Sequence, residues 1–147
     1  MAVEDHHLAH AMRSLGRSLL SLELSEWSGD STMLAGGFAW AGMVQVRGDF
    51  NGGFAIRCGT HAAESMARGL VQETGSLSDE LIQATIVELT HLLAGSLVPL
   101  MEGSVKLEPA LAMQGSGVTT LGSSSRIEAR STHDLDGEAV EVTLFRS

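Results

Sequence analysis

The chain has 147 residues, 44% of them apolar, which is typical of one folded domain and not of a disordered chain. Its 18 acidic and 9 basic residues give a net charge of −9, which excludes a basic footprint for nucleic acid or anionic lipid. The single cysteine, Cys58, excludes an internal disulfide. The acidic start is unlike a signal peptide, and the apolar stretch 33–44 is too short and glycine-interrupted to span a bilayer. We therefore expect a cytoplasmic protein with no membrane partner.

Apolar residues recur at helical spacing through the first segment. Leu8, Met12, Leu15, Leu19 and Leu22 follow one another at steps of four, three, four and three residues. This pattern predicts an amphipathic helix whose apolar side covers a core. Nothing in the sequence resembles a linker or a repeat, so we treat residues 1–147 as a single domain, with a frayed end expected at 1–4.

An antiparallel hairpin is predicted after a polar turn at 26–31. Two apolar segments, 38–47 and 54–58, are separated by a glycine-rich connection that contains Asn51 and Gly52. Asn-Gly is a strong hairpin signal, because both residues tolerate the positive φ that a tight turn requires. We expect strands over these two segments.

Two further helices are predicted after the hairpin. Thr60 is placed to cap a helix over 61–71, and Ser78 to cap a longer one over 79–101 that Pro99 ends or bends. The longer helix carries an apolar stripe at steps of three and four residues. The residues of the stripe are Ile82, Ile86, Leu89, Leu93, Leu97 and Leu100.

The last third of the chain has the pattern of strands. Segments 104–113, 118–129 and 139–145 are β-rich, and glycine-containing turns at 115–117 and 133–137 separate them. Helices and strands are segregated along the chain, which favours an α+β fold with an antiparallel or mixed sheet and three helices.

Glu88 and His91 of the long helix fall on the side opposite its apolar stripe. Ala84, one turn before Glu88, and Gly95, one turn after His91, share that side. A carboxylate and an imidazole therefore lie on one turn between very small residues, where another surface can approach closely. This predicts a partner-facing polar site, and the simpler interpretation is an ordinary solvated helix face.

Three other features are candidates for chemistry. Glu88 and His91 also match the Glu-x-x-His pair of di-iron bundles, but that site needs a second pair and two more glutamates. His6 and His10 are spaced to meet on one helix face beside His7, an arrangement that favours adventitious metal affinity over a dedicated site. The apolar surroundings of Cys58, Trp27 and Trp40 place these three side chains in the core.

The chain resembles the CheX branch of the CheC-type chemotaxis phosphatases. The resemblance covers about residues 5–146 and rests on the glycine-led hairpin, the following short helix and, above all, the segment from Glu88 to His91 followed by Gly95. Pro109 lies near the proline that follows this helix in the family. The resemblance implies an α+β CheX-like fold and a homodimer formed through sheet edges.

The family signature is Glu-x-x-Asn on a helix that docks against a phosphorylated response-regulator receiver domain. By this resemblance Glu88 pairs with a lysine of the receiver, and the residue at position 91 orients the water that attacks the aspartyl phosphate. His91 stands where the family has Asn, so a neutral imidazole replaces a neutral amide. The chain needs no cofactor of its own, because a divalent metal is expected on the receiver.

Three hypotheses follow from these residues. The first is a receiver phosphatase in which Glu88 docks and His91 orients water. The second is a catalytically inactive receiver-binding module of the same fold. The third is a structural signalling component that makes no receiver contact, since one fold serves many functions.

Overall fold

The computed structural model describes residues 2–29, 38–72, 75, 77–115 and 126–147. The helical segments are α1 (Asp5–Leu15), the π-helical turn η1 (Gly16–Leu20), α2 (Thr60–Val71), α3 (Asp79–Leu97) and the 3₁₀ turn η3 (Val98–Leu100). The strands are β1 (Ser25–Glu26), β2 (Trp40–Gly48), β3 (Gly52–Cys58), β4 (Val105–Leu107), β5 (Leu111–Gln114), β6 (Arg126–Leu135) and β7 (Glu138–Arg146).

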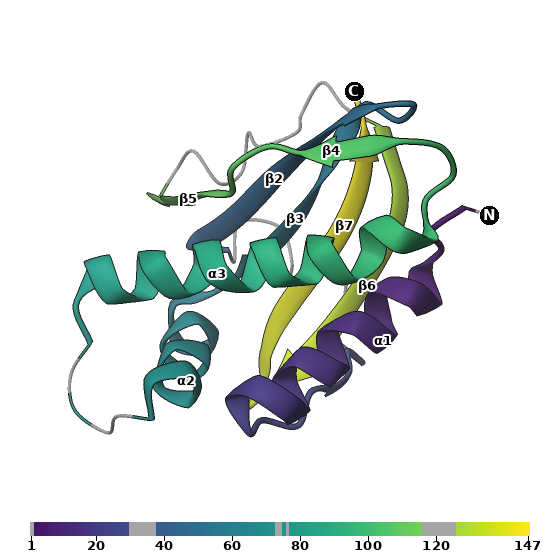
Figure 1. The fold of residues 1–147 in the computed structure, drawn as a ribbon. Coiled ribbons are helices and arrows are strands. Elements are labelled where there is room, and N and C mark those ends of the chain that lie inside the picture. The colour runs from purple at the N-terminus through teal and green to yellow at the C-terminus, as the bar shows by residue number, and fades with distance from the viewer. Residues whose placement is uncertain (1, 30–37, 73–74, 76, 116–125) are drawn as a thin grey trace.

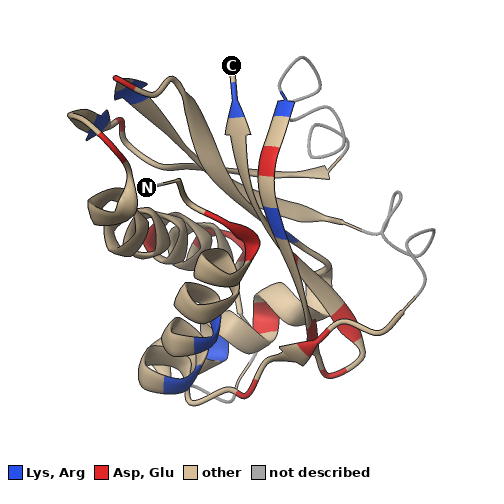
Figure 2. Cartoon of the chain, turned by 90° about the vertical axis from the view of Figure 1, so that its right-hand side faces the viewer, with Lys and Arg blue, Asp and Glu red and all other residues tan. Residues whose placement is uncertain are grey.

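The strands form one seven-stranded sheet in the order β1-β6-β7-β3-β2-β4, and β5 also pairs with β2. Every strand pair is antiparallel. The three α-helices lie together on one face of this sheet, with α3 crossing the strands (Figure 1, Figure 2). The architecture is therefore α+β with an antiparallel sheet and three helices, as the sequence predicted.

The core lies between the helices and the sheet. Gly42 of β2 faces α3, and its strand partners Ile56 and Val142 share that face of the sheet. Both of these side chains are buried, as is the apolar stripe of α3 from Ile82 to Leu97. Burial of this stripe confirms the predicted face of the long helix, and Leu100 at its end is half-buried in η3.

The end of the first helix differs from the prediction. α1 passes into the wider turns of η1, so the buried residues continue through Gly16 and Leu20 instead of following the predicted stripe. Leu15 and Leu19 are only half-buried. A π-helical turn holds more residues than an α-helical turn, and a periodicity argument that assumes 3.6 residues per turn cannot anticipate the change. At the other end Val3 is buried and Glu4 is the N-cap residue of α1.

The antiparallel hairpin predicted around Asn51 and Gly52 is confirmed as β2 and β3, but its connection is not a tight Asn-Gly turn. The positive φ of the β2–β3 connection lies at Gly48, whereas Asn51 acts through its side chain, which accepts from Gly48 N–H and donates to Gly48 O. The two-residue turn with positive φ at both positions is instead Asp136–Gly137, between β6 and β7. Asp-Gly is an equally good signal for such a turn.

The remaining strands also shift. β6 continues through Leu135, so most of the predicted 133–137 turn is strand, while the predicted strand 118–129 lies mainly outside the described residues. The predicted segment 104–113 is divided into β4 and β5, with Pro109 in the break. The segment predicted as a polar turn begins with the short strand β1, which pairs with β6.

The cap of α2 comes from a distant part of the chain. Thr60 is the first residue of the helix and not its cap, and the Glu138 carboxylate accepts a hydrogen bond from Ala62 N–H at 3.0 Å. The prediction that Thr60 caps α2 was therefore wrong, because Glu138, the first residue of β7, supplies the acceptor. Pairing across 76 residues of sequence cannot be read from a local pattern.

The most membrane-like segment is α3 with η3. Residues Asp79–Leu100 are long and apolar enough to cross a membrane by length and composition, a test that core helices of soluble proteins also pass. In this fold the apolar side of α3 packs against the sheet.

Candidate functional site

α3 is fixed on the sheet by a close helix–strand approach. Ser78 Oγ accepts from Leu81 N–H at 3.2 Å and so begins the helix, as predicted. Thr90 donates its hydroxyl to Ile86 O at 2.7 Å and faces Gly42 of β2, where a Cβ atom would overlap the Thr90 hydroxyl. This approach sets the rotation of α3 about its own axis.

The opposite side of α3 is open. Ala84, Glu88, His91 and Gly95 are all exposed, in agreement with the helical projection of the sequence. Residues three apart on a helix place their Cβ atoms about 5–6 Å apart, so the carboxylate and the imidazole can act on one group. A Cβ built on Gly95 meets nothing within 4 Å, which leaves room for another backbone.

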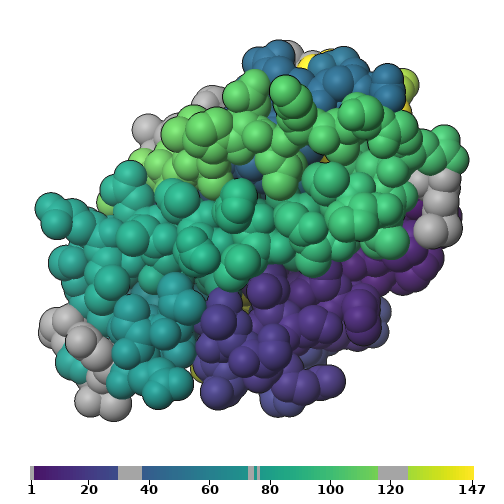
Figure 3. Space-filling model, in the orientation of Figure 1, coloured from purple at the N-terminus to yellow at the C-terminus, as the bar shows by residue number. Residues whose placement is uncertain are grey.

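Neither candidate side chain is engaged by the residues that the structure describes. Among the residues that the structure describes, Glu88 and His91 have no hydrogen-bond or ion-pair partner. From Leu81 to Leu100, Glu88 is the only Asp, Glu, Lys or Arg. The site is an isolated carboxylate beside an imidazole on a largely apolar helix, which crosses the front of the molecule between β4–β5 above and α1 and α2 below (Figure 3).

The histidine cluster is rearranged relative to the prediction. The group of potential metal ligands that the described residues bring together consists of Glu4, His6 and His7, whose ligand atoms lie within 4.8 Å of one another. His10 was expected to meet His6, but it is not part of this group. Histidine spacing alone does not identify Glu4 as a member of this group. The available signal is that an acidic residue just before a helix often caps it, which places Glu4 beside the first turn of α1.

The di-iron interpretation finds no support in the described residues. They bring no further carboxylate or imidazole ligand group to Glu88 and His91. A carboxylate-bridged metal pair needs ligands from several helices, and here the pair is on the outer side of one helix.

Cys58 and Trp40 are core residues, as predicted. Both are buried, and burial, together with the nearby Glu138 carboxylate, raises the pKa of the Cys58 thiol to about 12. Trp27 is only half-buried, with its indole nitrogen shielded from solvent. In the described part of the chain, Cys58 belongs to no group of potential metal ligands.

The sequence profile of the chemotaxis phosphatase CheX matches residues 40–129, which is more than half of the chain. The chain belongs to the CheX family. The matched region runs from β2 into β6 and contains the whole of α3, and it confirms the resemblance drawn from the hairpin and the Glu88 turn. No curated protein sequence matches the chain significantly.

Solved structures share this fold at low sequence identity. CheX from Vibrio vulnificus has a TM-score of 0.75 at 12% identity, with 97% of this chain and 95% of that chain covered. A CheX-CheY-BeF3-Mg²⁺ complex from Borrelia burgdorferi contains a chain with a TM-score of 0.75 at 20% identity, with 97% of both chains covered. The FliM middle domain of Vibrio alginolyticus is less similar, with a TM-score of 0.54 at 14% identity. The match covers 95% of this chain and 88% of that chain.

Proposed function

We propose that this protein docks on the phosphorylated receiver domain of a response regulator through the exposed side of α3 and hydrolyses the aspartyl phosphate. The observation that carries the proposal is the pairing of Glu88 and His91 on one turn, both exposed and both without a hydrogen-bond or ion-pair partner among the described residues. Membership of the CheX family supports it, as does the complex of the Borrelia burgdorferi relative with CheY.

Glu88 is assigned to docking. It is an isolated carboxylate on an otherwise neutral stretch of helix, so it is available to pair with a lysine of the receiver. A hydrogen bond between charged groups is about twice as strong as a neutral one and fixes orientation. Ala84 and Gly95 allow the receiver to approach the helix on either side of this contact.

His91 is assigned to the attacking water. The water oxygen bonds to phosphorus while the bond from phosphorus to the aspartyl oxygen breaks, which releases inorganic phosphate and the free carboxylate. A neutral imidazole has one acceptor nitrogen and can hold the water or take its proton, whereas the family amide can only orient it. Phosphoryl transfer depends mostly on such positioning, and the metal ion belongs to the receiver.

The alternative is a receiver-binding or structural module without catalysis. The residue that differs from the family signature is the one that would contact the water, so docking can survive while hydrolysis is lost. The fold similarity to the FliM middle domain is the observation that favours a structural role.

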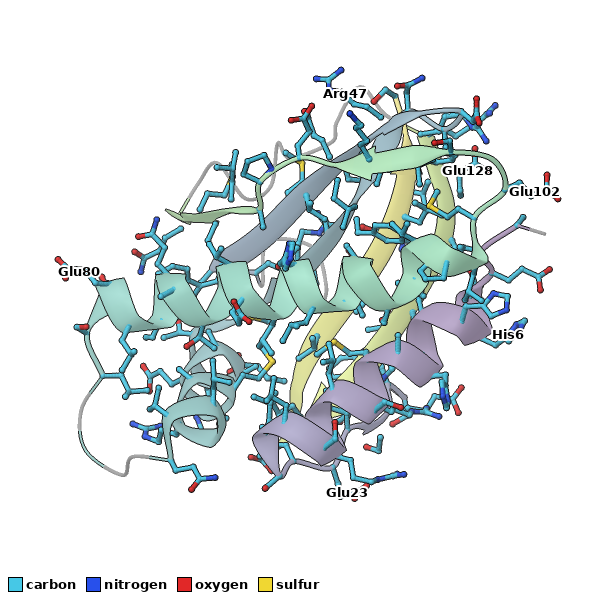
Figure 4. The ribbon with its side chains drawn as sticks, in the orientation of Figure 1. His6, Glu23, Arg47, Glu80, Glu102 and Glu128 are labelled. Carbon is cyan, nitrogen blue, oxygen red and sulfur yellow. The ribbon has the colours of Figure 1, made fainter. Side chains whose placement is uncertain are left out.

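The test is the decay of a phosphorylated receiver from the same organism, with and without this protein. We would compare wild type with Glu88→Ala, His91→Ala and His91→Asn. Glu80→Ala is the matched control, because Glu80 is an exposed glutamate on the same helix, two turns before Glu88 (Figure 4). Binding of each variant to the phosphorylated receiver would be measured in parallel by biolayer interferometry.

Each outcome selects one hypothesis. Faster decay that needs Glu88 and His91 but not Glu80 supports a phosphatase that uses histidine. Binding without faster decay, with hydrolysis appearing only in His91→Asn, supports an inactive binding module. The absence of binding to every phosphorylated receiver of the organism overturns the proposal and favours the structural role.

A homodimer is part of this proposal. Among the described strands β5 pairs only with β2, and Leu111 on it is 61% exposed. Unpaired sheet edges and exposed apolar side chains favour association. Light scattering on wild type and on Leu111→Lys would show whether the chain is a dimer and whether this edge forms it.

A further inference from the structure

Two imidazoles and a carboxylate converge at the start of α1. The rings of His6 and His7 lie with their centroids 4.1 Å apart, and His6 Nδ1 is 3.6 Å from Glu4 Oε2. One ligand atom from each of the three residues lies within 4.8 Å of the other two. This grouping is separate from the Glu88 and His91 pair, and the proposed function makes no use of it.

A cavity next to this cluster brings in a third histidine. Its volume is about 470 Å³. His6 and His7 of the first turn of α1 and His10 of the next turn line it, as do Ser96 and Leu100 of the α3–η3 segment. Figure 4 shows His6 beside the end of α3. Three imidazole side chains therefore line one cavity. Histidines on an ordinary solvated helix face would have no such shared cavity.

We propose that Glu4, His6 and His7 form a binding site for a divalent transition-metal ion such as Zn²⁺, with His10 as the additional donor from within the cavity. Two imidazole nitrogens and one carboxylate oxygen are a ligand set that zinc sites use, and imidazole donors also suit copper and nickel. The cavity leaves room for a water molecule or a ligand from a partner on the metal.

Coordination competes with the cap of α1. His7 Nδ1 accepts a hydrogen bond from Glu4 N–H at 2.9 Å, which places the ring proton on Nε2. Binding of a metal to His7 breaks this cap bond: the ring either presents Nδ1 to the metal, or moves its proton from Nε2 to Nδ1 so that Nε2 can bind.

The electrostatic setting permits a cation at this position. A helix N-terminus carries partial positive charge and by itself disfavours a metal ion. Here the Glu4 carboxylate is directly at the site, and the chain has a net charge of −9. These negative charges offset the effect of the helix end.

The test is calorimetric titration of Zn²⁺ into the full chain without an affinity tag, in a non-coordinating buffer at pH 7.5. We expect one saturable site, with affinity lowered on the order of tenfold or more in Glu4→Gln, His6→Ala and His10→Ala. His61→Ala is the matched control, because His61 is an exposed histidine in the first turn of α2, and it should bind like wild type. Circular dichroism of each variant checks that α1 is retained.

A second readout is the visible spectrum of the Co²⁺-substituted protein, which reports donor type and coordination number. A spectrum of imidazole and oxygen coordination that disappears in the His6→Ala, His7→Ala double variant supports the site. Failure of Zn²⁺ to saturate one site, or saturation that persists in the double variant, overturns the proposal. Neither result depends on phosphatase activity or receiver binding.

Discussion

Gly42 of β2 and Thr90 of α3 lie in direct contact, so that a single methyl group on Gly42 would overlap the Thr90 hydroxyl. Thr90 is between Glu88 and His91 in the sequence but faces the sheet, whereas they face outward. The contact therefore fixes the position of the candidate site, which lies on the other side of the same helical turn.

Replacement of Gly42 by alanine should destabilise the protein and disturb the site. The added Cβ must displace Thr90 and the neighbouring Ile86 of α3, and overpacking of this kind costs about 1–3 kcal/mol. Urea denaturation would measure the loss. A second variant, Gly42→Ala with Thr90→Ala, should recover part of the stability, and an unchanged midpoint in Gly42→Ala would contradict the tight approach.

The other glycine that bears on this helix, Gly95, should behave in the opposite way. It is exposed on α3 with no atom near its missing Cβ, so Gly95→Ala removes unfolded-state entropy and should stabilise the protein by about 0.5–1 kcal/mol. Under the proposed function the same methyl group should weaken receiver binding. A stability gain without any change in binding would place the docking surface elsewhere.

Glu138 and Thr60 give a direct test of how α2 is capped. Glu138→Ala removes the acceptor of Ala62 N–H and should cost about 1 kcal/mol, while Thr60→Ala should change the free energy of unfolding little. Thermal and urea denaturation of the two variants would be compared. Equal destabilisation by both substitutions would contradict the distant cap.

His133 should make the protein sensitive to acid. Burial under α1, with the positive charge of Arg13 nearby, lowers the pKa of His133 from 6.5 to about 4. The unfolded chain binds the proton more readily, so the stability due to neutral His133 is complete above pH 6.5 and is lost as pH falls toward 4. Between pH 7 and 5 this amounts to about 2 kcal/mol of unfolding free energy.

The control for this prediction is His133→Gln, which keeps a polar group of similar reach to Ser131 but cannot titrate in this range. Its unfolding free energy, measured in urea at several pH values, should fall less steeply between pH 7 and 5 than that of wild type. Parallel curves for the two proteins would show that His133 does not titrate on unfolding.

Cys58 should be inert to thiol reagents in the native protein. At pH 8 a pKa of about 12 in place of 9.0 lowers the thiolate fraction by about a thousandfold, and burial also blocks access. Because Cys58 is the sole cysteine, the release of thionitrobenzoate from Ellman's reagent reports on it alone. The thiol should react at once in 6 M guanidinium chloride, and rapid labelling without denaturant would contradict its burial.

The exposed face of α3 shows how far a local pattern can lead. Its apolar stripe repeats over five turns, so the direction of Glu88 and His91 follows from helical geometry as soon as the stripe is buried. The two hairpins show what a local pattern cannot predict. Asn51 and Asp136 each precede a glycine, and only the second pair adopts positive φ at both positions, because strand register decides which connection is tight.

The sequence by itself determined the fold class, the long helix with its buried and exposed sides, and the candidate pair Glu88 and His91, because each depends on residue types at short, regular spacing. Only the tertiary structure decided that Glu138 caps α2. It also decided that Glu4 lies beside His6 and His7, and that His6, His7 and His10 line one cavity. Those contacts depend on side-chain rotamers at a helix end and on segments that are far apart in the sequence and adjacent in the fold. Neither kind of contact produces a periodic pattern in the sequence.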